Sequence, residues 1–346
     1  MSAVLISCWA GMGNVGDDWL LRVALDRVEA SKVGVLLESS ATLPTYANGC
    51  PVLRWPPLRP VTPETVWAWR RFRRELTEWS AIVSFGGGWL AGDQGVETLG
   101  RWLLRFRLAS RPVFGVELSV GPFPSRRSRH LGHNLLKTFD ILTVRSNADA
   151  EEVERLLHRA PLVVGDGVLF DKEYSHEQPR VPRRGVVVAA ARPYDHWLYR
   201  DAWSAYAERI ALVASKLVEP TESVSFVSFQ KPDDAAFWKP YGKVITPIDV
   251  STALDLVRNA RVVIASRFHA TLAAVIASVP VVPIGYHQKF TSLEEFGIRA
   301  LSIKEFMSDD RVLLTRQNAV HSNRVLEHAR DRWSELMKKV SERLVG

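Results

Sequence analysis

The chain has 346 residues, of which 47% are hydrophobic and 24% are charged. This composition is that of a folded protein, and it excludes a disordered or low-complexity chain. Because one hydrophobic core rarely serves more than about 300 residues, we expect two domains with a ligand cleft between them. The formal net charge of +7 favours an anionic partner without identifying it.

The cysteines and the N-terminal residues indicate a cellular compartment. Cys8 and Cys50 are too few for a disulfide framework, and Cys8 falls in an apolar run typical of a buried strand. The first residues enter a strand pattern at once, and no apolar run approaches membrane-spanning length. We therefore expect a cytoplasmic protein.

Short β-branched runs alternate with longer segments of helical period, which is the pattern of βαβ units and a parallel sheet. In the first half we expect strands at residues 4–8, 33–37, 82–85, 113–118, 141–144 and 162–164, with helices between them. In the second half we expect strands at 186–190, 224–229, 262–265 and 281–284 and helices at 202–217, 253–259 and 270–277. The sequence thus predicts an α/β protein with two Rossmann-like parallel-sheet domains.

A polar segment divides these two halves. Residues 171–184 contain two prolines and have no apolar period, as expected of a linker. We place an N-terminal domain at 1–172, a linker at 173–184 and a C-terminal domain at 185–346. A helical period at residues 323–344 predicts a last helix that packs back on one of the domains.

The first glycine turn has two interpretations. Residues 11–16 (GMGNVG) have the spacing of a dinucleotide-binding turn, and Glu38 lies where such proteins bind a ribose. However, Asp17 and Asp18 stand at the start of the next helix, where a pyrophosphate would have to lie. In the alternative, the glycines only permit a tight turn and the carboxylates complement the helix dipole. This motif alone leaves both interpretations open.

Two more glycine turns follow strands. Gly86-Gly87-Gly88 comes after the strand expected at residues 82–85 and exposes its backbone to a ligand. Since open α/β sheets bind ligands at the carboxyl ends of their strands, we favour a binding role for this turn. The turn at residues 165–167 lies near the domain boundary and is explained equally well as a hinge.

The strand expected at residues 262–265 runs into Ser266, Arg267, Phe268 and His269, followed by an alanine-rich helix. Ser266 is a good N-cap. A helix N-terminus prefers acidic residues by about 0.3–1 kcal/mol per charge, yet this one carries a guanidinium and an imidazole. A bound phosphate or carboxylate would satisfy these groups. In the alternative, both side chains are hydrogen-bonded within the fold.

Two neighbouring strand ends supply further cations. Lys289 follows the strand expected at 281–284, and Arg192 follows the strand expected at 186–190. Because carboxyl ends of parallel strands meet at one edge, both residues are expected to converge with Arg267 on a small doubly anionic ligand.

These motifs resemble the polysaccharide pyruvyl transferase family over most of the chain. The resemblance covers an Asn-x-Gly-Asp turn, a triple-glycine turn, an Arg-Ser pair, a Gly-Asp pair and a Ser-Arg-Phe-His-Ala segment. It continues in a Val-Pro pair and a Tyr-x-x-Lys motif. Phe268 replaces the family's usual leucine. The residues concerned are Asn14, Gly16, Asp17, Gly86 to Gly88, Arg145, Ser146, Gly165, Asp166, Ser266 to Ala270, Val279, Pro280, Tyr286 and Lys289.

The resemblance implies a fold similar to GT-B glycosyltransferases and a phosphoenolpyruvate donor. Its pyruvyl group would pass to a sugar of a polysaccharide or of a lipid-linked glycan, forming a ketal and releasing phosphate. On this basis His269 and Arg267 are expected to be catalytic, with Asp17 as a base or acceptor-hydroxyl ligand. No metal and no further cofactor are expected. The expected substrate-binding residues are Arg192, Ser266, Phe268, Lys289, Asn14, Gly16, Gly86, Gly87 and Gly88.

Three other functions compete with this one. A GT-B glycosyltransferase that uses a nucleotide sugar needs the same kind of diphosphate-binding helix terminus. An NAD-dependent oxidoreductase would use the turn at residues 11–16 and Glu38. A nucleic-acid-binding module is suggested by charge alone, and because no binding motif accompanies the charge we expect no nucleic-acid partner.

Two expected helices combine aromatic residues with arginines. In the first, apolar and basic residues fall on opposite faces, and in the second they are interleaved over residues 101–107. Such helices can rest on an anionic membrane, which would suit a lipid-linked acceptor at the inner membrane face. In the alternative, the apolar face is core and the arginines are only solvated. The first helix has Val66, Trp69, Phe72, Leu76 and Trp79 on one face and Arg70, Arg71 and Arg74 on the other.

Overall fold

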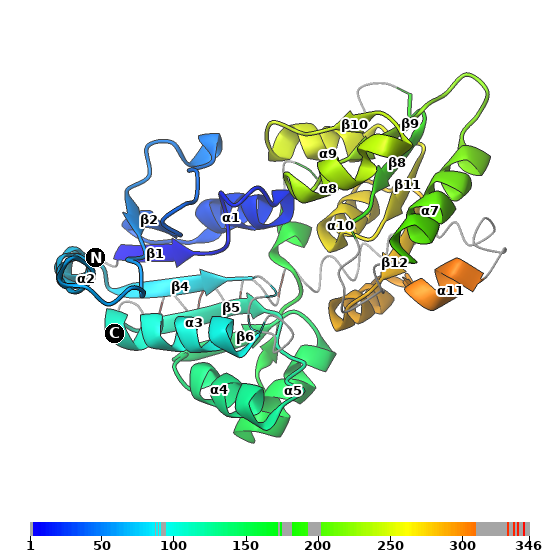
Figure 1. The fold of residues 1–346 in the computed structure, drawn as a ribbon. Coiled ribbons are helices and arrows are strands. Elements are labelled where there is room, and N and C mark those ends of the chain that lie inside the picture. The colour runs from blue at the N-terminus through cyan, green and yellow to red at the C-terminus, as the bar shows by residue number, and fades with distance from the viewer. Residues whose placement is uncertain are drawn as a thin grey trace. The chain divides into compact units, whose positions relative to one another are not determined.

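A computed structural model describes residues 3–86, 88, 90, 95–171, 174, 182–192, 202–308, 331, 335, 338 and 342. The chain forms two compact units (Figure 1). The first contains residues 3–12, Asp17–Gly167 and the described positions 331, 335, 338 and 342, and the second contains Gly13–Gly16 and residues 168–308. The linker expected at 173–184 is described only at 174 and 182–184, and the last helix expected at 323–344 lies mostly outside the described residues.

The first unit is built on a parallel sheet of seven strands in the order β3-β2-β1-β4-β5-β6-β7. In Figure 1, α1 lies on one face of this sheet and α3 and α4 lie on the other. The chain runs outward from β1 to β3 and then returns to β4, so the strand order reverses beside β1. The strands are β1 Ala3–Ser7, β2 Lys32–Leu37, β3 Val52–Arg54, β4 Ala81–Phe85, β5 Val113–Leu118, β6 Ile141–Val144 and β7 Leu162–Val163. The helices are α1 Val15–Arg27, α2 Pro63–Glu75, α3 Val96–Ala109, α4 Arg126–Leu136 and α5 Asn147–Leu157, with short 3-10 turns at Thr45–Ala47, Leu76–Glu78 and Gly167–Phe170.

The second unit repeats this plan with six parallel strands in the order β10-β9-β8-β11-β12-β13. Its order reverses between β8 and β11, whose ends pair as Ala189 with Ala265. The strands are β8 Val186–Ala189, β9 Val224–Val227, β10 Val244–Ile245, β11 Val262–Ala265, β12 Val281–Gly285 and β13 Leu301–Ser302. The helices are α7 Trp203–Leu217, α8 Asp233–Trp238, α9 Val250–Arg258, α10 Phe268–Ile276 and α11 Ile303–Ser308, with 3-10 turns at Lys239–Tyr241 and Gln288–Phe296.

Each unit has its own aromatic core. In the first, the fully buried Trp55 contacts Trp69 of α2 and Trp102 of α3 at ring-centroid distances of 6.3 and 6.0 Å. In the second, Phe226 of β9 stacks on Trp238 of α8 with centroids 5.2 Å apart. Because a separate core supports each sheet, each unit positions its own ligand edge.

The predicted fold class is confirmed, since both units are parallel-sheet α/β structures. Every strand expected from the sequence exists, and its ends differ from the prediction by at most two residues. The prediction missed β3, β10 and β13, which have only two or three residues each and therefore show no period.

Two expectations for α2 are wrong. Val66, assigned to the apolar inner face, is 44% exposed, because the face that packs inward is formed by Thr65, Trp69 and Phe72. Trp79 lies beyond the end of the helix in extended backbone and is buried. Among the described helices, none is both long and apolar enough to cross a membrane.

Candidate active site

In the second unit, the ends of β8 and β11 are joined by a buried serine. The Ser266 hydroxyl accepts hydrogen bonds from the backbone N–H of Ala191 (2.8 Å) and from the Tyr206 hydroxyl (3.2 Å). Burial raises the pKa of Tyr206, which keeps this phenol a neutral donor. The expected N-cap role of Ser266 is wrong, because α10 begins after Arg267 and has no side-chain cap. Ser266 instead fixes the spacing of the two strand ends.

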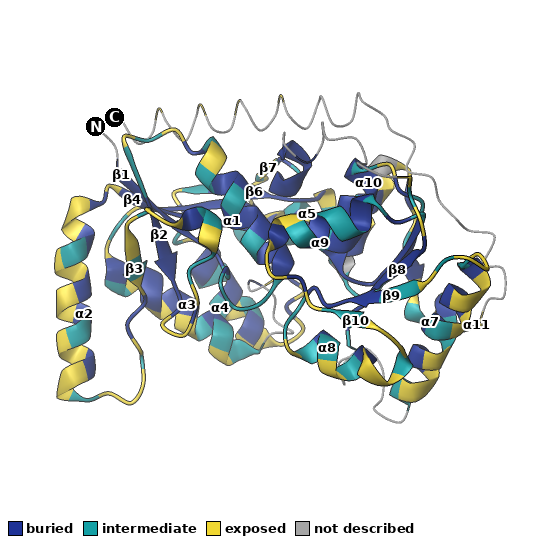
Figure 2. Ribbon diagram, turned by 90° about the horizontal axis from the view of Figure 1, so that it is seen from above, coloured by how far each residue is buried: buried dark blue, intermediate teal, exposed yellow. Residues whose placement is uncertain are grey.

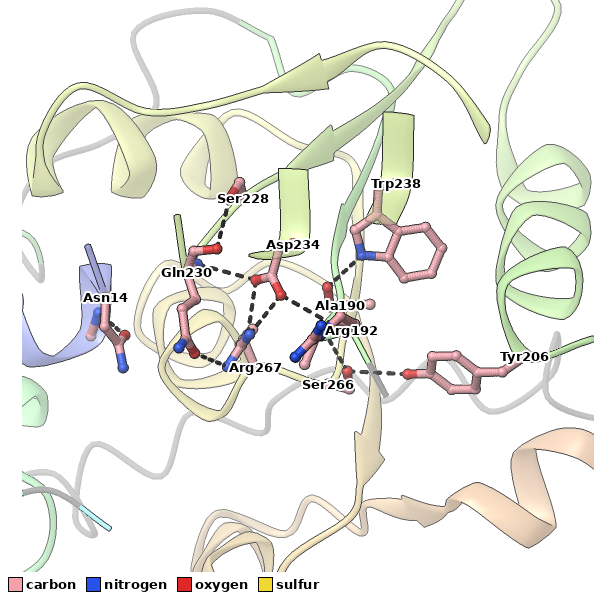
Figure 3. A network of polar contacts seen from close by, with 12 residues as sticks. Asn14, Ala190, Arg192, Tyr206, Ser228, Gln230, Asp234, Trp238, Ser266 and Arg267 are labelled. Atoms are coloured by element: carbon pink, nitrogen blue, oxygen red, sulfur yellow. Dashed lines mark hydrogen bonds and ion pairs between the residues drawn. The ribbon is translucent and has the colours of Figure 1, made fainter. Parts of the chain in front are cut away.

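Arg267 is held by a buried carboxylate that the sequence did not reveal (Figure 3). Its Nε and Nη2 donate to the two oxygens of Asp234 at 2.9 and 2.6 Å, and its Nη1 donates to Gln230 Oε1 at 2.7 Å. Asp234 is fully buried and also accepts from the backbone N–H groups of Arg192 and Gln230, both at 3.1 Å. One carboxylate therefore fixes Arg267 and the backbone of Arg192, so it connects the ends of β8 and β11.

The turn before α1 belongs to this site. Val15 N donates to Phe229 O at 2.9 Å, Lys231 N donates to Gly13 O at 2.8 Å, and Asn14 forms a bridge with Gln230. Asn14 Oδ1 accepts from Gly16 N at 3.0 Å and so holds the turn closed. The predicted residues Asn14 and Gly16 are thus brought to the network around Arg267.

Gly16 lies directly against His269. A Cβ atom at position 16 would stand 1.9 Å from His269 Nδ1, which no real contact allows. Only glycine fits here without movement of the imidazole. His269 occupies the first turn of α10, so the helix N-terminus and the glycine turn together set the position of its ring.

Lys289 joins the site through aromatic rings. Its ammonium lies 5.3 Å from the ring centre of Tyr286 and 5.9 Å from that of Phe268. Phe268 is buried and also contacts His269, with centroids 5.6 Å apart. Arg192 places its guanidinium 5.7 Å from the ring of Trp203. The structure therefore collects the predicted residues of the C-terminal half at one sheet edge, as expected for strand ends at a reversal of strand order.

The first unit has a corresponding edge, at which Gly86 meets a buried arginine. Arg145 follows β6, and its Nε donates to Glu117 O at 2.9 Å and pairs with Asp166 at 3.2 Å. Its Nη2 has no hydrogen-bond partner among the described residues, and a Cβ at Gly86 would lie 2.6 Å from this atom. In the sequence, Arg145 is distinguished only by the Arg-Ser pair of the family resemblance. Of the predicted glycine turn, Gly87 lies outside the described residues, and Gly88 has nothing near its Cβ position.

Asp17 and Glu38, two acidic residues of the first unit, have different surroundings. Asp17 is buried in the first turn of α1, next to Asp18, whose side chain accepts from Gly11 N at 2.6 Å. Both oxygens of Glu38 are bound by the buried Arg105, one of them at 2.9 Å. An NAD-dependent oxidoreductase would need Glu38 to bind the ribose of its cofactor, but this carboxylate is already paired with Arg105. The fold therefore does not favour that function.

Comparison with solved structures defines the class of fold. The chain is similar to Anabaena HepE in complex with UDP and glucose, with 13% identity, a TM-score of 0.61 and complete coverage of both chains. It is also similar to the Methanocaldococcus jannaschii UDP-GlcNAc 2-epimerase, with 12% identity, a TM-score of 0.60 and coverage of 97% of this chain and 100% of that one. S. aureus MnaA with UDP gives 13% identity, a TM-score of 0.60 and 94% coverage of each chain. The two units thus form a GT-B fold.

The family follows from the sequence model. The model for polysaccharide pyruvyl transferase matches residues 14–288, so the chain belongs to this family of transferases. The match begins at Asn14 and ends just before Lys289, and it therefore includes the turn that contacts His269. No curated protein matches the chain.

Proposed function

We propose that this transferase moves the pyruvyl group of phosphoenolpyruvate onto a sugar of a polysaccharide or lipid-linked glycan precursor. The product is a pyruvate ketal, and phosphate is released. Membership of the polysaccharide pyruvyl transferase family supports pyruvyl as the group that is transferred. The choice of phosphoenolpyruvate as donor rests on one observation. In the second unit, Arg192, His269 and Lys289 lie around Arg267, whose guanidinium is held in place by hydrogen bonds.

The reaction makes three chemical demands. A proton adds to the methylene carbon of the donor, and a sugar hydroxyl attacks the adjacent carbon and loses its proton. The bond to phosphate then breaks, and a second hydroxyl attacks the same carbon and loses its proton, which closes the ketal. The site must therefore bind a carboxylate and a phosphate, deliver one proton and accept others.

Two cations are assigned to the anionic groups of the donor. Asp234 offsets the charge of Arg267 through two short contacts, whereas the Lys289 ammonium faces aromatic rings. We therefore assign phosphate and carboxylate binding to Arg192 and Lys289, and we assign to Arg267 the task of orienting the catalytic turn. Fixed cations of this kind favour the developing charge of the transition state because they need no reorganisation.

His269 is assigned to proton transfer, since histidine is the side chain that changes charge near neutral pH. Gly16, in a turn that Asn14 holds closed, lies against its ring, and Phe268 also contacts the ring. Ser266 contributes by fixing the ends of β8 and β11, which are followed by Arg192 and Arg267.

The acceptor is assigned to the first unit. Asp17 would accept the proton of a sugar hydroxyl or bind that hydroxyl, and Gly86, Gly87 and Gly88 would let the sugar approach the backbone. The buried Arg145 behind Gly86 supports a polar ligand at this edge. The donor supplies the reactive group itself, so no further cofactor is needed. With a lipid-linked acceptor the enzyme would work in the cytoplasm, at the inner face of the membrane.

The test is phosphate release from phosphoenolpyruvate, measured against a panel of glycosides and lipid-linked sugars. His269→Ala is expected to lower turnover by about 10²–10⁴-fold, the usual contribution of general acid–base catalysis. Lys289→Ala is expected to raise the KM for phosphoenolpyruvate. His158→Ala and Arg299→Ala, which change exposed residues elsewhere, serve as matched controls.

If folded His269→Ala and Lys289→Ala variants release phosphate as fast as the unmodified protein, His269 and Lys289 do not have the roles proposed for them. No release with any acceptor would count against the donor. The second candidate, a glycosyltransferase that uses a nucleotide sugar, is favoured by the UDP bound in the similar structures. Saturable binding of UDP together with sugar transfer from a UDP-sugar would establish that function instead.

A further inference from the structure

The outer face of α2 exposes an apolar cluster in the first unit. Val61, which precedes the helix, is 80% exposed, Trp67 is 62% exposed and Val66 is 44% exposed. Of the tryptophans that the structure describes, Trp67 alone is mainly exposed. A shallow groove of about 930 Å³ runs along this cluster from Val61 to Arg70.

The helix cannot rotate to bury this cluster. Its inner face is fixed by Trp69, whose indole N–H donates to Pro57 O at 3.0 Å and whose ring contacts Trp55. Its start is fixed by a reciprocal capping box between Thr62 and Thr65. Figure 2 shows the result, since one side of α2 is dark blue and the other is yellow along its length.

Arginines lie on the C-terminal side of the exposed indole, and Glu64 lies one turn before it. Arg70, Arg71 and Arg74 follow Trp67 by three, four and seven residues, so they lie on the same side of the helix. The Arg71 guanidinium is 6.0 Å from the Trp67 ring, and its Nε contacts Glu75 at 2.8 Å. The outward surface therefore combines an exposed indole with a patch of arginines beside it.

The positive charge extends over the neighbouring helices. Rings of α2 and α3 pack on Trp55, and α3 contacts α4, so the three helices cover the same face of the sheet. Together they carry ten arginines, of which Arg105 is buried, against three glutamates. Such a face is attracted to a surface of negative charge.

We propose that the outer face of α2, formed by Val61, Val66 and Trp67 with Arg70, Arg71 and Arg74, docks on an anionic membrane surface. Tryptophan partitions to the level of the lipid headgroups, and the valines extend the apolar contact beside it. The arginines contact lipid phosphates. The apolar centre distinguishes this surface from a nucleic-acid site, where the contacts at the centre would be to phosphates and base edges. This inference does not depend on the proposed donor.

The experiment is co-sedimentation of the full-length protein with phosphatidylcholine vesicles, with and without about 30 mol% phosphatidylglycerol. We expect partitioning only to the anionic vesicles, and weaker partitioning at about 0.5 M salt than at about 0.05 M, because salt screens exposed charges. Trp67→Ser and the double variant Arg70→Glu/Arg74→Glu should each lower the partition coefficient about ten-fold.

Two matched controls come from the second unit. Ile248→Ser changes a residue that is 86% exposed, and Arg299→Glu changes an exposed arginine, so neither should alter partitioning. Thermal unfolding of each variant verifies the fold, and the arginine double variant tests the surface even if Trp67→Ser fails to fold. Unchanged partitioning of the folded α2 variants, or an equal loss in the controls, would overturn the proposal. Binding to duplex DNA that is lost in the arginine variant but kept in Trp67→Ser would also overturn it.

Discussion

At the scale of single residues, Gly16 gives the sharpest test of the site. Gly16→Ala adds one methyl group where a Cβ would stand 1.9 Å from His269 Nδ1, so the imidazole must move. A displacement of about 1 Å near the chemistry can cost about 10²-fold in rate, and we expect a loss of that order in kcat. Steady-state phosphate release together with thermal unfolding measures both effects.

Gly100→Ala is the control for the backbone. Gly100 lies within α3 and has nothing within 4 Å of its Cβ position, so alanine should be neutral or stabilising there by up to about 1 kcal/mol. Gly16 is also in the first turn of a helix, so backbone propensity alone does not predict a loss. Full activity in folded Gly16→Ala would show that the His269 ring is not held by this contact.

The residues around Arg267 show where prediction from one sequence ends. Arg192, Arg267 and Lys289 were predictable because each follows a strand whose apolar pattern is clear. Asp234 and Gln230 were not, since they lie in the loop and short helix after β9 and nothing local distinguishes them from solvated residues. Their role arises from hydrogen bonds to Arg267, which lies 33 and 37 positions further along the chain. The hydrophobic periodicity of a sequence contains no information on such distant contacts.

At the scale of elements, a partly buried ion pair ties α7 to the start of β11. Arg261 donates from Nη2 to Leu217 O at 2.6 Å and to Glu222 at 2.7 Å. These hydrogen bonds from Arg261 lower the pKa of Glu222 from 4.5 to about 2. Because folding lowers the pKa of Glu222, its ionised carboxylate stabilises the folded protein at pH values above 4.5. This stabilisation is lost as the pH falls from 4.5 towards 2.

Glu222→Gln should therefore lower the free energy of unfolding at pH 7, and the difference from the unmodified protein should shrink as the pH falls below 4.5. Urea unfolding at several pH values measures this difference. Glu219→Gln is the control, because Glu219 contacts the same arginine at 3.4 Å but its side chain is 61% exposed. A difference that stays constant down to pH 2 would contradict the assigned pKa.

Elements differ in how well the sequence predicts them. The central strands β5 and β11 were predicted because they are buried along their whole length and are mainly apolar in sequence. The inner face of α2 was predicted only in part, because apolar spacing does not tell which of two faces meets the core. Val66 and Trp67 are apolar yet exposed. The buried face of α2 is the one whose Trp69 and Phe72 pack on Trp55.

At the scale of the whole molecule, the two-domain organisation followed from length and from alternation of strands and helices. The assignment of Gly13–Gly16 to the second unit did not, because these residues follow closely after β1 of the first unit along the chain. Their hydrogen bonds to Phe229 and Lys231 come from the other half of the chain. Sequence proximity therefore does not reveal that this segment lies against His269.

The separate cores predict separate unfolding. Trp55→Ala and Trp238→Ala each empty an aromatic site that is 1% exposed, and each should cost about 3–5 kcal/mol. Hydrogen exchange followed by peptide should then accelerate across β1 to β7 in the first variant and across β8 to β13 in the second. Peptides that cover residues 13–16 should follow the second variant, because Val15 N is bonded to Phe229 O. Equal acceleration in both units by either substitution would show instead that the chain unfolds as one cooperative body.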